Sequence, residues 1–147
     1  MDIQFRNIKK QDIETIVQMS AQFGYEIRYG NFTERINELI KNSSHAIIVA
    51  TNAENKAVGW IQLEMSSFIF SDKTCIILAV FVDKNFRGNQ IGKKLIEKAE
   101  IWAKEKGCMS FKICSDLTRI DLQAFYKHMG FELVKSEQVF FKRFKKP

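Results

Sequence analysis

Residues 74–104 constrain the fold more than any other part of this 147-residue chain. Residues 75–82 form an unbroken apolar, largely β-branched run, which predicts a strand buried on both faces of a sheet. From Ile91 onward the apolar residues recur at helical spacing, with lysine and glutamate between them. A loop that holds Gly88 and Gly92 joins the two segments, so the sequence predicts a strand, a loop and a helix in direct succession.

The composition of this loop suits a phosphate group. A helix N-terminus offers backbone N–H groups without helical partners and the positive end of the helix dipole. Arg87, Lys93 and Lys94 add positive charge. The chain lacks a Walker loop, and the spacing of its two loop glycines does not give the G-x-G-x-x-G pattern of a Rossmann fingerprint. A strand–loop–helix corner without a ligand remains the alternative at this point.

Length and composition indicate one globular domain over residues 1–147. The apolar fraction of 46% excludes a disordered chain. No apolar stretch approaches the ~20 residues that cross a bilayer, and the N-terminus has no apolar signal core. We therefore expect a cytoplasmic protein that does not enter a membrane. The three cysteines, Cys75, Cys108 and Cys114, match no zinc spacing, so we expect reduced thiols and no metal site.

The formal net charge of +6 raises the question of nucleic-acid binding. The sequence contains no recognisable recognition helix and no aromatic RNA-binding motif. An anionic cofactor explains part of the basic charge more economically, and the rest is expected to be solvated surface. A nucleic-acid partner is therefore not expected.

Apolar periodicity along the whole chain predicts the element order β-α-α-β-β-β-α-β-α-β-β. The predicted strands are residues 3–8, 45–51, 57–65, 75–82, 109–114, 131–135 and 138–144. Gly24, Gly107 and Gly130 are predicted to end the first, third and last helices.

Two motifs in the chain resemble those of the GNAT family of N-acetyltransferases. Arg87-Gly-Asn-Gln-Ile-Gly92 resembles the family's acetyl-CoA pyrophosphate loop, [QR]-x-x-G-x-[GA], and Phe125-Tyr-Lys-His-Met-Gly-Phe131 resembles its [FL]-Y-[EK]-x-x-G-F segment. The order of the predicted elements is also that of the GNAT fold. The resemblance implies an α/β (α+β) fold, in which four helices flank a mixed, mostly antiparallel β-sheet of about seven strands.

The resemblance also implies acetyl-CoA as co-substrate. Its pantetheine arm is expected to pair with the central strand, and its pyrophosphate to bind the loop amides. The implied cofactor contacts are Val80, Phe81, Val82, Arg87, Gly88, Asn89, Gln90, Ile91, Gly92, Lys93 and, for a CoA phosphate, Arg119. Gln90 stands where the family usually has glycine, and a side chain there is compatible with the loop only if its φ angle is negative.

Tyr126 is the expected general acid, again by resemblance. A phenol of pKa ~10 can reprotonate a departing thiolate of pKa ~8.5. The alternative role for Tyr126 is purely structural, with its ring packed on the sheet. Many relatives carry a glutamate on the central strand as general base, but this chain has Leu78, Ala79 and Val80 there. Glu64 on the preceding strand is the remaining candidate base.

The acceptor is expected to be a primary amine of a small molecule or a peptide. By resemblance, its entrance involves the connection between the first two helices, and the predicted substrate residues are Tyr25, Glu26, Arg28, Tyr29 and Glu64. The sequence thus predicts direct acetyl transfer in a ternary complex, by an enzyme that can form a homodimer through its apolar C-terminal strands. A non-catalytic acyl-CoA-binding sensor or scaffold is the alternative function.

Overall fold

The computed structural model describes residues 2–22, 24, 29–115, 118 and 120–145, without the side chains of residues 29 and 30. The chain divides into two compact units, residues 1–114 and 115–147. The prediction that residues 1–147 form a single domain stays a prediction.

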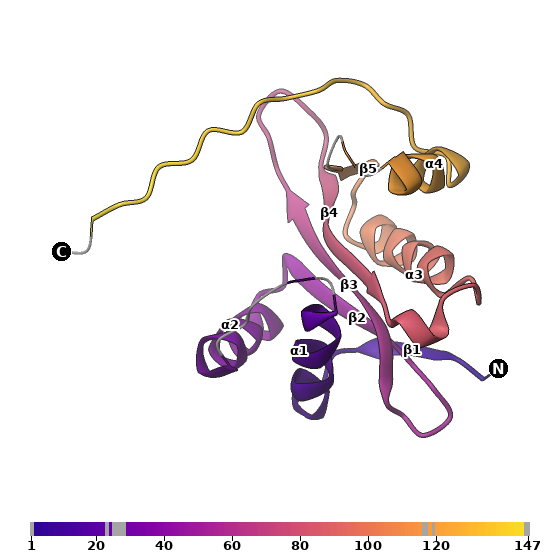
Figure 1. Ribbon diagram of the computed structural model, residues 1–147. Coiled ribbons are helices and arrows are strands. Elements are labelled where there is room, and N and C mark those ends of the chain that lie inside the picture. The colour runs from indigo at the N-terminus through magenta and orange to yellow at the C-terminus, as the bar shows by residue number, and fades with distance from the viewer. Residues whose placement is uncertain (1, 23, 25–28, 116–117, 119, 146–147) are drawn as a thin grey trace. The chain divides into compact units, whose positions relative to one another are not determined.

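The first unit is built on a five-stranded sheet with strand order β1-β2-β3-β4-β5 (Figure 1). Neighbouring strands are antiparallel, except that β5 runs parallel to β4 after the crossover through helix α3. The strands are β1 (Gln4–Asn7), β2 (His45–Thr51), β3 (Ala57–Ser66), β4 (Thr74–Val82) and β5 (Ser110–Ile113).

Helices cover both faces of this sheet. The 3-10 turn η1 (Lys10–Asp12) leads into α1 (Ile13–Ala21), and α1 and α2 (Tyr29–Lys41) lie on one face. Helix α3 (Ile91–Glu105) lies on the other, where its buried residues Leu95 and Ala99 face the sheet. Because strand side chains alternate between faces, β3 supplies Trp60 to the first core and Ile61 to the second. No helix among the described residues is long and apolar enough to span a membrane.

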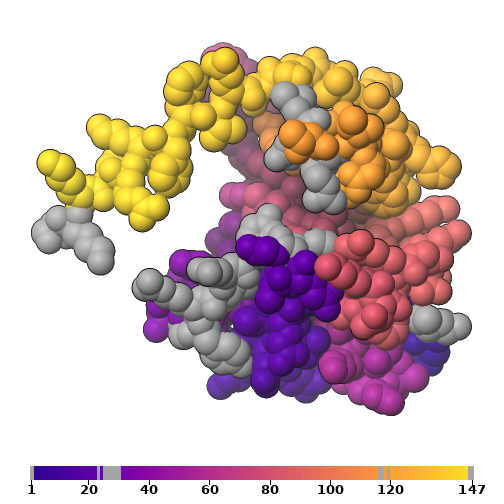
Figure 2. Space-filling view, in the orientation of Figure 1, coloured from indigo at the N-terminus to yellow at the C-terminus, as the bar shows by residue number. Residues whose placement is uncertain are grey.

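The second unit contains helix α4 (Ile120–His128), which ends before Gly130 at a φ angle of +95°. The two closing strands predicted over residues 131–135 and 138–144 are not formed, so the described chain has five strands rather than seven. Figure 2 shows the described part of this segment in yellow, as an extended chain. Its apolar side chains are largely exposed, such as Val139 at 90% and Phe140 at 89%. Alternating apolar residues indicate strand propensity, but a strand also needs a partner edge, and local sequence does not report one.

Candidate functional site

A β-bulge divides β4 into two halves. Gln62 of β3 lies opposite Ala79, whereas Leu63 lies opposite Ile77, so Leu78 is an extra residue on β4. Leu78 is 46% exposed. The prediction of a strand buried on both faces is therefore wrong at this position, because the bulge turns one apolar side chain out of the alternating pattern.

The pairing between β4 and β5 ends at the same place. Parallel pairing runs from Thr74 opposite Ser110 to Ile77 opposite Ile113. From Leu78 to Val82, β4 pairs only with β3 among the described strands. One edge of residues 78–82 thus carries backbone N–H and C=O groups that a peptide-like chain could bind by strand addition. Three of the predicted cofactor residues, Val80, Phe81 and Val82, lie on this edge.

The chain reaches α3 through a turn that is held by its own polar groups. In the 3-10 turn η2 (Lys84–Phe86), the Asp83 carboxylate accepts a hydrogen bond from the Asn85 N–H at 2.9 Å. The Asn89 side-chain amide donates to the Phe86 carbonyl at 3.0 Å. Gly88 has a φ angle of +85°, a conformation that favours glycine. The loop is therefore ordered before α3 begins.

Gln90 is the N-cap residue of α3 and adopts the left-handed conformation, with φ +59° and ψ 22°. The φ angle of Gln90 was expected to be negative, and this expectation is wrong. The chain takes the conformation that a glycine would favour, although Gln90 carries a Cβ atom. Its side chain makes no capping hydrogen bond, so it does not occupy the N–H groups of the first turn of α3.

The start of α3 is electropositive. Its first turn contains no acidic residue, and Arg87, Lys93 and Lys94 are exposed around it. A helix of 15 residues with such a first turn attracts anions through its N–H groups and its dipole. The predicted cofactor residues 87–93 all lie in this loop and in the first turn of α3, and their role in binding a cofactor stays a prediction.

Gly59 lets this helix start lie directly against the unpaired half of β4. A Cβ atom at Gly59 would meet the Phe81 carbonyl oxygen at 3.1 Å and Cγ2 of Ile91 at 3.3 Å. Gly59 lies opposite Val82 in the β3–β4 pairing. The close packing places the start of α3 over the Gly59–Val82 pair, at the end of the unpaired half of β4. An anion-attracting turn at the end of an unpaired strand half is the combination that a long thioester with a pyrophosphate needs.

Replacing Gln90 by glycine is expected to stabilise the protein. The left-handed conformation costs a residue with a side chain about 1–2 kcal/mol, and the greater flexibility of glycine in the unfolded chain offsets roughly 0.5–1 kcal/mol of that gain. We expect the free energy of unfolding to rise by about 0.5–1 kcal/mol in a denaturant titration. The matched control is Gln90→Ala, which keeps the Cβ atom and should give no gain; an equal gain in both variants would contradict the argument.

Tyr126 lies in the second unit, on α4, and its side chain is buried. Its ring packs edge-on against Phe131 at a centroid distance of 5.9 Å and against Phe125 at 5.7 Å. The backbone N–H of Phe131 donates to the Tyr126 carbonyl at 3.0 Å. The [FL]-Y-[EK]-x-x-G-F segment is thus a folded helix end that holds the tyrosine in one orientation.

Glu64 is paired with His45 across β2 and β3. The two residues are directly opposite each other, and Glu64 Oε1 lies 3.9 Å from His45 Nε2. On β4, Glu64 lies opposite Ile76, and Ile76 belongs to the half of β4 that pairs with β5. Glu64 and Gln62 share one face of the sheet with Ala79. The candidate base is therefore on the α1–α2 face, opposite Ile76, which lies two residues before the start of the unpaired edge at Leu78.

Several predicted residues lie outside the described part of the chain, namely Tyr25, Glu26, Arg28 and Arg119. Of Tyr29 the structure describes only the backbone, as the first residue of α2.

The cysteines are free thiols. Burial, and to a smaller extent the neighbouring Cys108, raises the pKa of the Cys75 thiol to about 12. Cys75 is therefore a poor nucleophile at neutral pH, because the thiolate is the reactive form.

Comparison with known proteins gives one family and a consistent fold. The family described as "Acetyltransferase (GNAT) family" matches residues 12–131. An uncharacterised N-acetyltransferase of Methanocaldococcus jannaschii is 27% identical over 135 residues, which is 86% of this chain; the chain spans 59% of the length of that relative.

Two solved structures share the fold. A transcriptional regulator from Bacillus halodurans has a TM-score of 0.85 at 24% identity, over 95% of this chain and 100% of that one. A glucosamine-6-phosphate N-acetyltransferase from Arabidopsis thaliana has a TM-score of 0.83 at 20% identity, over 96% of this chain and 99% of that one.

Proposed function

Because the chain belongs to the acetyltransferase (GNAT) family, we propose that it transfers the acetyl group of acetyl-CoA directly to a primary amine in a ternary complex. The observation that supports this most is the unpaired half of β4 beside the electropositive start of α3. In the proposal the backbone of Val80, Phe81 and Val82 binds the pantetheine arm. The amides of residues 87–93 bind the pyrophosphate, and Arg119 contacts a phosphate of CoA.

Two side chains carry the proton transfers in this proposal. An amine of pKa ~10.4 is neutral in only about one molecule in a thousand at pH 7, so a proton acceptor is needed before attack. Glu64 takes this proton through water, since it lies beside the unpaired edge and not on it. Nitrogen then bonds to the acetyl carbon, the C–S bond breaks, and Tyr126 donates its phenol proton to the departing thiolate. The proton that nitrogen loses as the amide forms passes through water to the Tyr126 phenolate and restores the phenol. The high pKa of Cys75 supports direct transfer over an acetyl-cysteine intermediate.

Binding of acyl-CoA without catalysis is the second candidate function. Two observations favour it: β4 carries no carboxylate, and Glu64 Oε1 lies 3.9 Å from His45 Nε2, so the candidate base already has a neighbouring partner. Incubation with acetyl-CoA and a panel of primary amines separates the two. The enzyme releases CoA thiol in proportion to N-acetylated amine, whereas a binder takes up acetyl-CoA and releases none.

The proposed enzyme is a cytoplasmic homodimer. Free cysteines suit a reducing compartment. The exposed apolar side chains Val139, Phe140, Phe141 and Phe144 suit burial against a second copy of the chain. Light scattering after size-exclusion chromatography should give twice the chain mass of 17.1 kDa, and Phe141→Lys should return the monomer mass. A wild-type monomer at micromolar concentration would contradict the dimer.

A further inference from the structure

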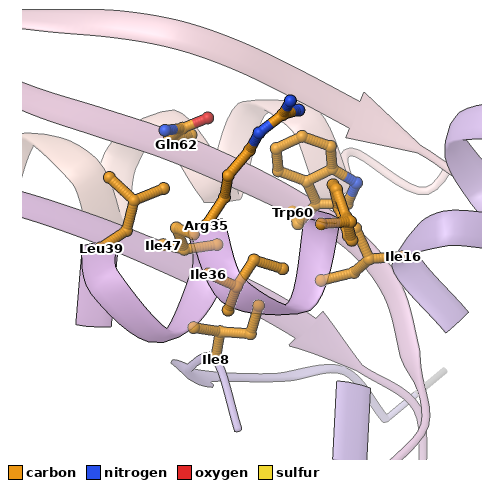
Figure 3. Close-up of a pocket in the computed structure, with 9 residues that line it drawn as sticks. Ile8, Ile16, Arg35, Ile36, Leu39, Ile47, Trp60 and Gln62 are labelled. Carbon is orange, nitrogen blue, oxygen red and sulfur yellow. The ribbon is translucent and has the colours of Figure 1, made fainter. Parts of the chain in front are cut away.

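A cavity of about 220 Å³ lies between α2 and the face of β2 and β3 that α1 and α2 cover. Most of its wall is apolar, with Ile36 and Leu39 from α2 and Ile47 from β2 (Figure 3). At ~30 Å³ for each liquid water molecule, this volume corresponds to roughly seven waters. It suits a ligand body of a few carbon atoms.

Two polar side chains of the lining, those of Arg35 and Gln62, lie on one side of the cavity (Figure 3). Arg35 of α2 and Gln62 of β3 extend their polar ends along one rim, while Ile8, Ile36 and Ile47 lie away from that rim (Figure 3). No carboxylate is among the lining residues. In the described part of the chain, Arg35 takes part in none of the ion pairs that are found. The rim therefore favours an anionic or hydrogen-bond-accepting group and disfavours a second cation.

The cavity borders the strand where transfer is proposed. Gln62 lies directly opposite Ala79 of β4, and Trp60, which lines the cavity, lies opposite Phe81 with their ring centroids 4.9 Å apart. Neighbouring strands are ~4.8 Å apart, so one strand width separates Gln62 from the unpaired edge of β4. On the α1–α2 face, Ala79 presents only a methyl group next to Gln62.

We propose that this cavity binds the non-reacting end of the acceptor, and that the acceptor is an amine carrying both a small apolar body and a carboxylate, as apolar amino acids do. The inference rests on the proposed acetyl transfer. The carboxylate binds Arg35 and the Gln62 amide, the apolar body lies against Ile36, Leu39 and Ile47, and the amine extends over Ala79. Polyamines and aminoglycosides are disfavoured, because they would place cations beside Arg35.

The test compares two amines with the same branched body, leucine and 3-methylbutylamine, which differ only in the carboxylate. We expect kcat/KM for leucine to exceed that for 3-methylbutylamine by roughly 10–100-fold, because an ionic hydrogen bond is lost without the carboxylate. Arg35→Gln should remove most of this preference by raising KM for leucine, while kcat/KM for 3-methylbutylamine changes less than about threefold. Lys41→Gln, which removes a charge from the same helix outside the cavity lining, should leave both unchanged.

A separate binding measurement distinguishes failure of this inference from failure of the proposed function. N-acetylleucine should raise the thermal midpoint of the wild-type protein and of Lys41→Gln, but not of Arg35→Gln. If amines are acetylated with no carboxylate preference, the inference is wrong and the transfer function stands. If no amine is acetylated while N-acetylleucine binds through Arg35, the cavity assignment stands and the transfer function falls. Failure of N-acetylleucine to bind wild-type protein would also overturn the inference.

Discussion

Tyr126→Phe is expected to lower kcat about 100-fold while leaving the affinity for acetyl-CoA unchanged. Proton transfer from a positioned acid contributes ~10²–10⁴-fold to rate. The lower end applies here because a thiol of pKa ~8.5 leaves well even without protonation. Phenylalanine keeps the ring that packs against Phe125 and Phe131, so the helix end should stay folded. Steady-state kinetics and an acetyl-CoA titration of the same preparation measure the two quantities.

The thermal midpoint of Tyr126→Phe serves as its control. Removing one hydroxyl group costs at most about one hydrogen bond, roughly 1 kcal/mol. A variant that unfolds far below the wild type would therefore indicate a structural effect. Wild-type kcat in a stably folded variant would remove Tyr126 from the mechanism. The structural role of Tyr126 would then be sufficient to explain its burial.

Asp12→Ala is expected to destabilise the protein by about 3 kcal/mol. Asp12 is only 2% exposed, and its two carboxylate oxygens accept hydrogen bonds from the Arg6 guanidinium at 2.7 and 2.9 Å. The backbone N–H of Lys9 also donates to Asp12 at 2.7 Å. These hydrogen bonds to Asp12 raise the pKa of Arg6. Removing one partner of a buried pair costs ~3–5 kcal/mol, and the lower value applies because Arg6 keeps some contact with water.

Asp12→Ala should also affect the cavity that α1 and α2 line. Asp12 ends η1, and the next residue begins α1, which contributes Ile16 to the cavity. Denaturant unfolding measures the loss of stability. The exposed pair Lys135–Glu137 provides the control, since Glu137→Ala should not change the midpoint measurably. An Asp12→Ala variant as stable as the wild type would show that the Arg6–Asp12 pair does not contribute to the free energy of unfolding.

Local patterns were sufficient to predict much of the first unit. The apolar run at residues 45–51 predicts β2 with the bounds that the structure gives. Likewise, the change from strand to helical periodicity predicts α3 from Ile91. Gly107 follows α3 with a φ angle of +83° and Gly130 follows α4 with one of +95°, as expected for glycines that end helices. These features depend on residues that are close together in the sequence, so the sequence alone is enough to predict them.

Features that depend on distant partners could not be predicted. The bulge at Leu78 arises from the register between β3 and β4, and a uniform apolar run gives no sign of an extra residue. The cavity at Arg35 and Gln62 requires a helix and a strand that are 27 positions apart to share one rim. The residues predicted as closing strands have strand-forming side chains, but a strand also needs a partner edge, and the described residues of this segment are not paired in the sheet.

Gln90 illustrates a third case, in which the expected backbone conformation was wrong. The sequence places a glutamine where glycine is usual, and a negative φ was the condition for tolerance. The turn from Asp83 to Gly88 and the start of α3 instead impose φ +59° on that residue. The surrounding structure thus imposes a conformation that glutamine does not prefer. The change in the free energy of unfolding in Gln90→Gly measures the cost of that conformation.

Thermal unfolding with acetyl-CoA, CoA and ADP tests the central claim most directly, because it requires no acceptor. A ligand at one hundred times its dissociation constant stabilises the native state by ~2.7 kcal/mol, which raises the midpoint of a domain of this size by roughly 5–10 °C. We predict such a rise with acetyl-CoA and with CoA, and a much smaller one with ADP, which lacks the arm that pairs with β4. No rise at millimolar acetyl-CoA would contradict the assignment of β4 and the start of α3 as its binding site.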